Sequence, residues 1–198
     1  MKGFSDEERD RIRAALMDAG RDLFARYGLR KTTIADLTDP VGIGTSTFYQ
    51  FFDSKEALYA EILEAEEEAI AERIMATSFE SEDDPRAAIE AFLHAIFEEI
   101  ETNPLIRTLM VEDELDRLEA QYSAEEQAQS RREELAFIVP HVERWQAEGR
   151  LREAEAETIA GAIRAMPLLT LHQDDIGENY AAVRDLLIES VAAGLVAE

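Results

Sequence analysis

Apolar residues recur at intervals of three and four along almost the whole chain, as they do on one face of a helix. No segment alternates apolar and polar residues with the period of two that a half-buried strand shows. Of all features of the sequence, this pattern limits the possible folds most, because it provides helix faces and offers nothing from which to build a sheet. The sequence therefore predicts an all-α fold.

Capping signals divide the first 76 residues into two long and two short helices. The expected ranges are 12–27, 33–39, 45–51 and 55–76. Gly28 stands where a C-terminal cap belongs, and Thr33 with Asp36 can form a capping box at the start of the second helix. That helix must end before Pro40, and a turn with two glycines separates it from the third.

Larger helices are expected in the rest of the chain, over residues 85–102, 105–118, 123–149, 154–172 and 179–195, which gives about nine helices in total. Pro85 suits the first position of its helix. Pro140 and Pro167 fall inside two others and are expected to kink them, because proline lacks the backbone donor and clashes with the preceding turn.

The two short helices and their flanks resemble the helix-turn-helix of the TetR family. The matching residues, in order and without gaps, are Ile12, Ala15, Leu23, Phe24, Gly28, Thr32-Thr33-Ile34, Leu37, Gly42-Ile43, Thr47-Phe48-Tyr49, Phe52 and Ser54-Lys55-Glu56-Ala57-Leu58. The chain departs from the family pattern at Gly44, where serine is common, and at Ser46, where glycine is common. The helix cap at Gly44 is therefore expected to be weak.

This resemblance implies a ligand-responsive transcriptional regulator, usually a repressor, that binds a palindromic operator in double-stranded DNA as a homodimer. It implies a three-helix DNA-binding domain over residues 1–53, followed by a larger helical domain for ligand binding and dimerisation over residues 54–198. The alternative is an acidic helical module that binds another protein.

Seven residues are candidates for DNA contact, namely Thr33, Thr45, Ser46, Thr47, Tyr49, Gln50 and Lys55. Residues 45–47 place hydroxyls and free amides in one helical turn, where phosphate oxygens bind well. The amide of Gln50 can pair with adenine, and Tyr49 offers a hydroxyl to a phosphate. Thr33 and Lys55 are expected to clamp the DNA backbone on either side, although Thr33 as a plain cap and Tyr49 as packing remain alternatives.

Charge is distributed unevenly along the chain. The formal net charge of -24 argues against a nucleic-acid partner, but residues 1–55 hold nine basic and nine acidic residues, so the rest of the chain carries the entire excess. All three lysines lie in this neutral part, and the other 17 cations are arginines. Such lysine-poor, acid-rich usage predicts adaptation to a very salty cytoplasm. An ordinary acidic mesophilic protein is the alternative.

Kinks at the two internal prolines predict a cavity between helices that could hold a small, largely apolar effector. The candidate lining residues are Phe92, Phe97, Met110, Phe137, Trp145, Met166 and His172. An ordinary hydrophobic core is the alternative for each of them.

The last two helices predict a dimer surface. Ser190 and Gly194 are small enough to let another helix approach closely. The candidate interface residues are Ile159, Ile163, Val183, Leu187, Ser190, Val191 and Gly194. Two such helices from each protomer would form a four-helix bundle about a two-fold axis, and an intramolecular core is the alternative.

Several classes of protein are disfavoured by the sequence. The chain has no cysteine, no catalytic motif of the His-Glu-x-x-His or Gly-x-Ser-x-Gly type, and no phosphate-binding loop, so neither an enzyme nor a cofactor is expected. Glu90, His94 and Glu98 share a helix face that is better explained as solvated than as a metal site. The longest uncharged stretch has 13 residues, too few for a membrane span, and a cytoplasmic location is expected.

Overall fold

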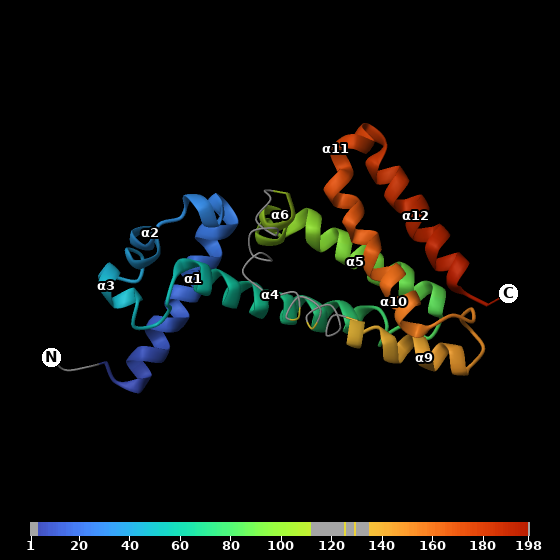
Figure 1. Cartoon of the computed structure of the whole chain (residues 1–198), viewed down its shortest axis with the longest axis horizontal. Coiled ribbons are helices and arrows are strands. Elements are labelled where there is room, and N and C mark those ends of the chain that lie inside the picture. Colours follow the sequence, from blue (N-terminus) through green and yellow to red (C-terminus); the bar gives the residue numbers. More distant parts are fainter. Residues whose placement is uncertain (1–3, 112–124, 126–128, 130–134, 198) are drawn as a thin grey trace. The chain divides into compact units, whose positions relative to one another are not determined.

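The protein is built from helices, as the computed structural model shows (Figure 1). The structure describes residues 4–111, 125, 129 and 135–197, and within them every element is a helix apart from one isolated bridge, between Leu151 and Val196. The predicted all-α fold is confirmed. None of the helices in these ranges is long and apolar enough to cross a membrane.

Two compact units make up the chain. The first comprises Met1–Ala69 and Asn103–Leu118, and the second comprises Ile70–Thr102 and Glu119–Glu198. The boundary predicted at residue 53 separates a DNA-binding part from a part for ligand binding and dimerisation. It does not coincide with the boundary between the two compact units, and it stays a prediction.

The first unit contains α1 (Asp6–Lys31), α2 (Ile34–Thr38), α3 (Thr45–Phe48), the first part of α4 (Lys55–Thr77) and α6 (Pro104–Val111). Its core consists of Ile12, Leu16, Phe24, Leu37, Phe48, Phe52, Leu58, Tyr59, Ile62 and Leu105. Gly20 allows α1 to lie close to α4, since a Cβ at this position would come within 2.7 Å of the Ile62 Cδ1 atom. Helix α6 packs along α1 and completes the core.

Local signals explain the break at Gly28 and both ends of α2, whereas α1 begins at Asp6, earlier than the predicted residue 12, and resumes after Gly28 as far as Lys31. The backbone of α1 is interrupted at Gly28, whose φ of 75° is a left-handed value that glycine adopts freely. The capping box of α2 is present: the Thr33 hydroxyl accepts from the Asp36 amide at 3.2 Å, and the Asp36 carboxylate accepts from the Thr33 amide at 2.9 Å. Helix α2 ends at Thr38, before Pro40.

The third helix is shorter than the predicted range of 45–51. Helix α3 ends at Phe48, and the chain continues through a tighter turn, in which Gln50 N donates to Thr47 O at 3.0 Å and Phe51 N to Phe48 O at 2.9 Å. Gly44 contributes no side-chain cap, and burial of Phe48 and Phe52 in the core holds the turn instead. We call residues 45–51 the recognition segment.

The second unit contains the end of α4, α5 (Pro85–Thr102), α9 (Val139–Ala147), α10 (Ala156–Ala165), the 3-10 helices η1 (Met166–His172) and η2 (Gly177–Asn179), α11 (Gln173–Ile176) and α12 (Tyr180–Leu195). Helix α12 lies along α5 (Figure 1). Two backbone hydrogen bonds tie the C-terminal residues to the segment after α9: Ala197 N donates to Arg150 O at 3.0 Å, and Arg152 N donates to Leu195 O at 2.9 Å.

Both internal prolines mark breaks rather than kinks. Pro140 stands at the beginning of α9, so the predicted continuous helix over 123–149 is wrong at this point. Pro167 ends the α-helical part of the predicted helix over 154–172, which continues as the tighter η1. Proline cannot donate the backbone hydrogen bond that would continue an α-helix through either position. Most of residues 112–134 lies outside the described part of the chain.

Candidate nucleic-acid interface

In the recognition segment, exposed polar side chains flank a buried phenylalanine. Phe48 is fully buried, whereas Thr45, Ser46 and Gln50 are exposed and Tyr49 is 57% exposed. The rings of Phe48 and Tyr49 meet edge to face, with their centroids 5.6 Å apart. Four of the predicted DNA-contacting residues are therefore available to a partner on one segment, and Thr47 is half-buried.

An open hollow of about 400 Å³ lies beside the recognition segment, lined by Arg30, Thr32, Thr33, Ile34, Tyr49, Asp53, Ser54, Lys55 and Glu56. It brings together Thr33, Tyr49 and Lys55, which the sequence placed at three separate points. The Ser54 hydroxyl accepts from the Ala57 amide at 3.0 Å and so caps the start of α4 at this hollow. A hollow with hydroxyls, a cation and a helix N-terminus is suited to a phosphate group.

Lys55 is bound within the first unit. Its Nζ atom donates to the carbonyl oxygens of Leu29 and Thr32, at 2.6 and 2.8 Å. Leu29 lies in the last turn of α1, beyond the interruption at Gly28, and Thr32 is the C-cap of this helix. The ammonium group thus stabilises a helix end at the edge of the hollow, a structural role that the sequence analysis missed, and one further N–H remains for a phosphate.

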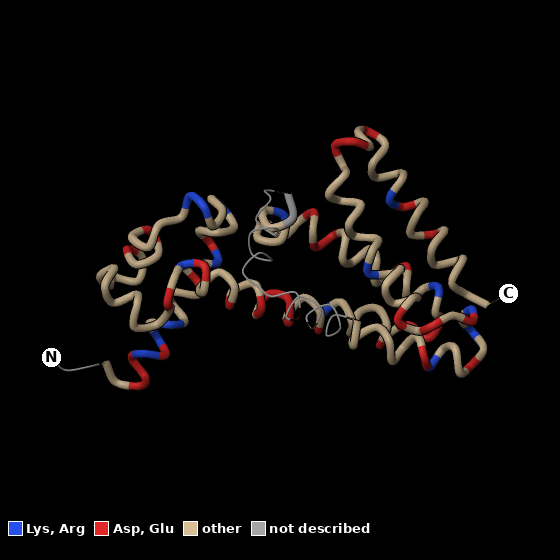
Figure 2. The backbone as a smooth tube through the Cα atoms, in the orientation of Figure 1, with Lys and Arg blue, Asp and Glu red and all other residues tan. Residues whose placement is uncertain are grey.

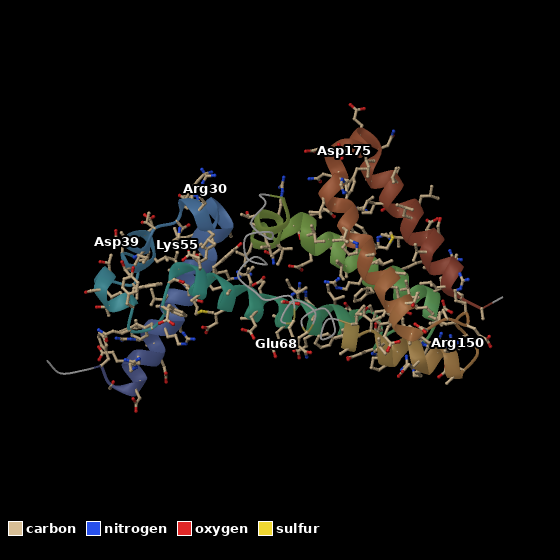
Figure 3. The ribbon with its side chains drawn as sticks, in the orientation of Figure 1. Arg30, Asp39, Lys55, Glu68, Arg150 and Asp175 are labelled. Atoms are coloured by element: carbon tan, nitrogen blue, oxygen red, sulfur yellow. The ribbon has the colours of Figure 1, made fainter. Side chains whose placement is uncertain are left out.

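Arg30 is a candidate that sequence reasoning missed. Its side chain extends outward from the end of α1 (Figure 3), and within the described residues it forms no ion pair or hydrogen bond. The signal that could have found it is its position, three residues before the Thr33 cap. Lys31 is likewise exposed.

Three other cations of the first unit are bound internally. Arg13 pairs with Glu61, Arg21 forms two bonds of 2.8 Å with Glu66, and Arg9 donates to the Gln50 carbonyl. Acidic and basic residues therefore lie interspersed over this unit (Figure 2). Hydrogen bonds from Thr33 hold the pKa of Asp36 below its usual value, so this carboxylate stays charged near the hollow.

The seven predicted effector-binding residues differ in their burial, and their role stays a prediction. Phe92, Phe97 and Trp145 are buried in the core of the second unit, and Met166 packs against that core. Phe137 is 54% exposed, and His172 is exposed and lies 3.3 Å from the Asp175 carboxylate. The side chain of Met110 lies outside the described residues.

An aromatic cluster that the sequence analysis missed surrounds Phe79. The Phe79 ring lies 4.9 Å from Phe92, 5.3 Å from His141 and 5.5 Å from Trp145, centroid to centroid. Burial lowers the pKa of His141, and the nearby Arg144 lowers it further, so this imidazole is neutral at pH 7.

The predicted dimer residues divide into two sets. Ile159 and Ile163 are buried in the core of the second unit, so the chain itself covers them. Val183, Leu187 and Val191 are half-buried, and Ser190 and Gly194 are exposed. Leu186, which belongs to the same apolar stripe of the last helix, is 64% exposed and lies four residues before Ser190. Leu186, Ser190 and Gly194 follow one another at four-residue steps and so form one exposed face of α12.

Comparisons with known proteins place this site in a family context. Residues 16–62 match the model for bacterial regulatory proteins of the tetR family. The HTH-type transcriptional repressor KstR2 of Rhodococcus jostii (strain RHA1) is 35% identical over 94 residues, which are 46% of this chain and 44% of that protein. The chain spans about half the length of the curated relatives that it matches.

Solved structures extend the similarity of fold to the whole chain. A TetR-family transcriptional regulator from Pectobacterium atrosepticum has a TM-score of 0.75 at 20% identity, and the match covers 98% of this chain and 99% of that one. The ketosteroid transcriptional regulator KstR2 of Mycobacterium tuberculosis has a TM-score of 0.56 at 22% identity, with 94% and 95% covered. The fold is therefore of the TetR type, and the curated relatives are transcriptional regulators rather than enzymes.

Proposed function

We propose that this TetR-type chain is a ligand-responsive transcriptional regulator, a repressor that binds a palindromic operator as a homodimer and leaves it when a small, largely apolar effector binds. The observation that carries the proposal is the recognition segment. It exposes Thr45, Ser46, Tyr49 and Gln50 on a fully buried Phe48, and it lies within the residues that match the tetR family model. Exposed hydroxyl and amide side chains on one short segment are what contact with a DNA groove and its phosphates needs.

In the proposed complex, the recognition segment enters the major groove, which is roughly 12 Å wide. Gln50 reads a base edge, while the hydroxyls of Thr45 and Ser46 hold the DNA backbone. One phosphate occupies the hollow, where Thr33, Tyr49 and Arg30 bind it. In the dimer, the two segments reach successive major grooves about 34–36 Å apart.

The exposed face of α12 is the surface that we assign to the second protomer. Leu186, Ser190 and Gly194 are exposed along it, and a two-fold axis would bring the same face of each copy together. Burial of Leu186 against its partner removes apolar surface from water.

The effector is assigned to the second unit. Its aromatic cluster around Phe79 would suit a largely apolar molecule, and one relative by fold is named as a ketosteroid regulator. The effector releases DNA only to the extent that it binds the released conformation more tightly. The acid excess and scarcity of lysine support operation in a very salty cytoplasm.

The test is fluorescence anisotropy of the purified protein on DNA from upstream of its own gene and on a shuffled duplex. The buffer contains roughly 2 M KCl, at which the Debye length is below about 3 Å. Selective binding by the wild type is expected, and a variant with Tyr49→Ala and Gln50→Ala should lose it while keeping its helical circular dichroism. Tyr27→Ala, which alters an exposed tyrosine of α1 away from the hollow, is the control and should bind normally.

Two outcomes would count against the proposal. If the wild type binds both duplexes alike, and selection from random DNA yields no preferred sequence, the chain is not a sequence-specific regulator. If the wild type is selective but the double variant binds as well as it does, another surface reads the DNA, and the role proposed for the recognition segment is wrong.

A further inference from the structure

The first turns of α1 reach over the end of the recognition segment. The Arg9 Nη2 atom donates to the carbonyl oxygen of Gln50 at 3.1 Å, and the Arg9 guanidinium carbon lies 5.1 Å from the centre of the Phe51 ring. One helical turn later, the Arg13 guanidinium lies 4.5 Å from the centre of the Phe52 ring. Because residues four apart lie on the same helix face, the two arginine side chains contact the rings of two adjacent phenylalanines.

The Gln50 carbonyl needs a donor from elsewhere. Helix α3 ends at Phe48, so the carbonyl groups that follow have no amide of a next helical turn to bind them. These carbonyls carry the partial negative charge of a helix end, which a cation stabilises. The amide of Gln50 is bound within the turn, by Thr47 O at 3.0 Å, whereas its carbonyl is bound by Arg9 of α1 rather than by a continuing helix.

The two arginines differ in what else they do. Arg13 also forms an ion pair with Glu61 of α4, so it links α1 to the body of the first unit. Arg9 is exposed, and within the described residues it forms no ion pair. Its hydrogen bond and its ring contact both go to the recognition segment, so its effect should be concentrated there.

We propose that Arg9 is a positioning residue for base recognition, which fixes the backbone of Gln50 so that the side-chain amide meets one base pair. This inference rests on the proposed function. A bidentate contact tolerates misplacement of only about 0.5 Å, so a freed backbone loses the contact. Loss of Arg9 therefore weakens discrimination at the base pair that Gln50 reads and leaves binding to other DNA nearly unchanged.

A direct phosphate contact by Arg9 would behave differently. It would add to binding of every sequence equally, and lysine would replace arginine because a point charge suffices for a phosphate. Positioning needs the planar guanidinium, which bonds the carbonyl while it lies over the ring. Arg9→Lys therefore separates the two roles.

The experiment begins with selection of a preferred duplex from random DNA by the full-length wild type. Anisotropy then gives the affinity for that duplex, for each single base-pair substitution and for a shuffled duplex. In the wild type, a substitution at the pair read by Gln50 should weaken binding by roughly 5- to 150-fold, the range of one bidentate contact. In Arg9→Ala and Arg9→Lys this ratio should fall to about one- to three-fold, with affinity for the shuffled duplex within about two-fold of the wild type.

Two further variants test whether the effect belongs to Arg9 alone and whether it acts through Gln50. Arg11→Ala removes the same charge from an exposed position of α1 and should match the wild type throughout. In a double variant with Gln50→Ala, removal of Arg9 should cause no further loss of discrimination, because it acts through Gln50. Thermal unfolding of each variant checks that the fold is intact.

Three results would overturn the inference. Arg9→Lys could keep the wild-type discrimination while Arg9→Ala binds all duplexes more weakly, which is the signature of a phosphate contact. Arg9→Ala could also leave discrimination unchanged, or reduce it equally with and without Gln50. Failure of the wild type to select any sequence would instead refute the proposed function, so the two failures are distinguishable.

Discussion

Replacement of Lys55 by methionine tests whether this lysine holds the first unit together. Methionine keeps the unbranched aliphatic chain but removes the ammonium group, which donates to the carbonyls of Leu29 and Thr32 at 2.6 and 2.8 Å. A hydrogen bond to a charged group contributes about 1.5–3 kcal/mol. Lys55 is only half-buried, so we take the lower end for each bond and expect the free energy of unfolding to fall by about 3 kcal/mol.

For a chain of this length, 1 kcal/mol corresponds to about 2–4 °C in the midpoint of thermal unfolding, so Lys55→Met should lower it by about 6–12 °C. Circular dichroism at 222 nm in about 2 M KCl measures the midpoint, at a salt concentration that screens surface charges. Lys31→Met is the matched control, because Lys31 is exposed and has no hydrogen-bond partner among the described residues. It removes the same charge and should change stability by less than about 0.5 kcal/mol.

The reasoning fails if Lys55→Met unfolds within about 1 °C of the wild type, a shift that corresponds to less than about 0.5 kcal/mol. If operator affinity nevertheless drops far more than in Lys31→Met, the ammonium group serves DNA binding and not the end of α1. A loss of both stability and affinity would show that one group does both.

Three further perturbations have defined outcomes. Hydrogen bonds from Thr33 lower the pKa of Asp36, so its contribution to stability is present above pH 3.8 and is lost as the pH falls through the lowered pKa. Asp36→Asn should therefore reduce the free energy of unfolding at neutral pH and make it depend less on pH below 3.8. An unchanged pH dependence in this acid range would contradict the argument. Gly20→Ala should destabilise the chain, because overpacking against Ile62 costs about 1–3 kcal/mol and exceeds the gain in helix propensity of about 1 kcal/mol. Gly161→Ala, with open space around it, should instead stabilise the chain by about 1 kcal/mol. Equal shifts of the two variants in calorimetry would refute the packing argument. Operator affinity should fall only shallowly between about 0.5 and 3 M KCl, and a steep loss in an anisotropy titration would contradict this.

Much of the fold could be predicted because its signals are local. The Thr33 capping box, the left-handed Gly28 and the proline at the start of α5 each act within four residues, so the sequence shows them directly. The length of α3 could not be predicted in this way. It depends on the burial of Phe48 and Phe52 in a core built from several helices.

The candidate site shows the same division. The hydroxyl-bearing residues 45–47 and the aromatic residues that directly follow them form a local pattern, so the sequence shows the recognition segment directly. The partners of Lys55 lie 23 and 26 residues earlier in the chain, so no local pattern reveals them. The effector residues stay a prediction, and the sequence alone could not give their burial, because a helical apolar stripe looks the same whether it faces a core, as Trp145 does, or solvent, as Phe137 does.

The use of cations in residues 1–55 links the site to the salt inference. Nine cations occur there, and Arg9, Arg13, Arg21 and Lys55 all bind groups of the chain itself. Such cations add little to attraction of the duplex, since their charge is shared with a carboxylate or a helix end. At molar salt that attraction is weak in any case, because charges are screened within about 3 Å and few counterions are released on binding. Under those conditions a cation contributes more to affinity by fixing the geometry of a reading residue, as proposed for Arg9 and Gln50, than by attracting phosphates from a distance.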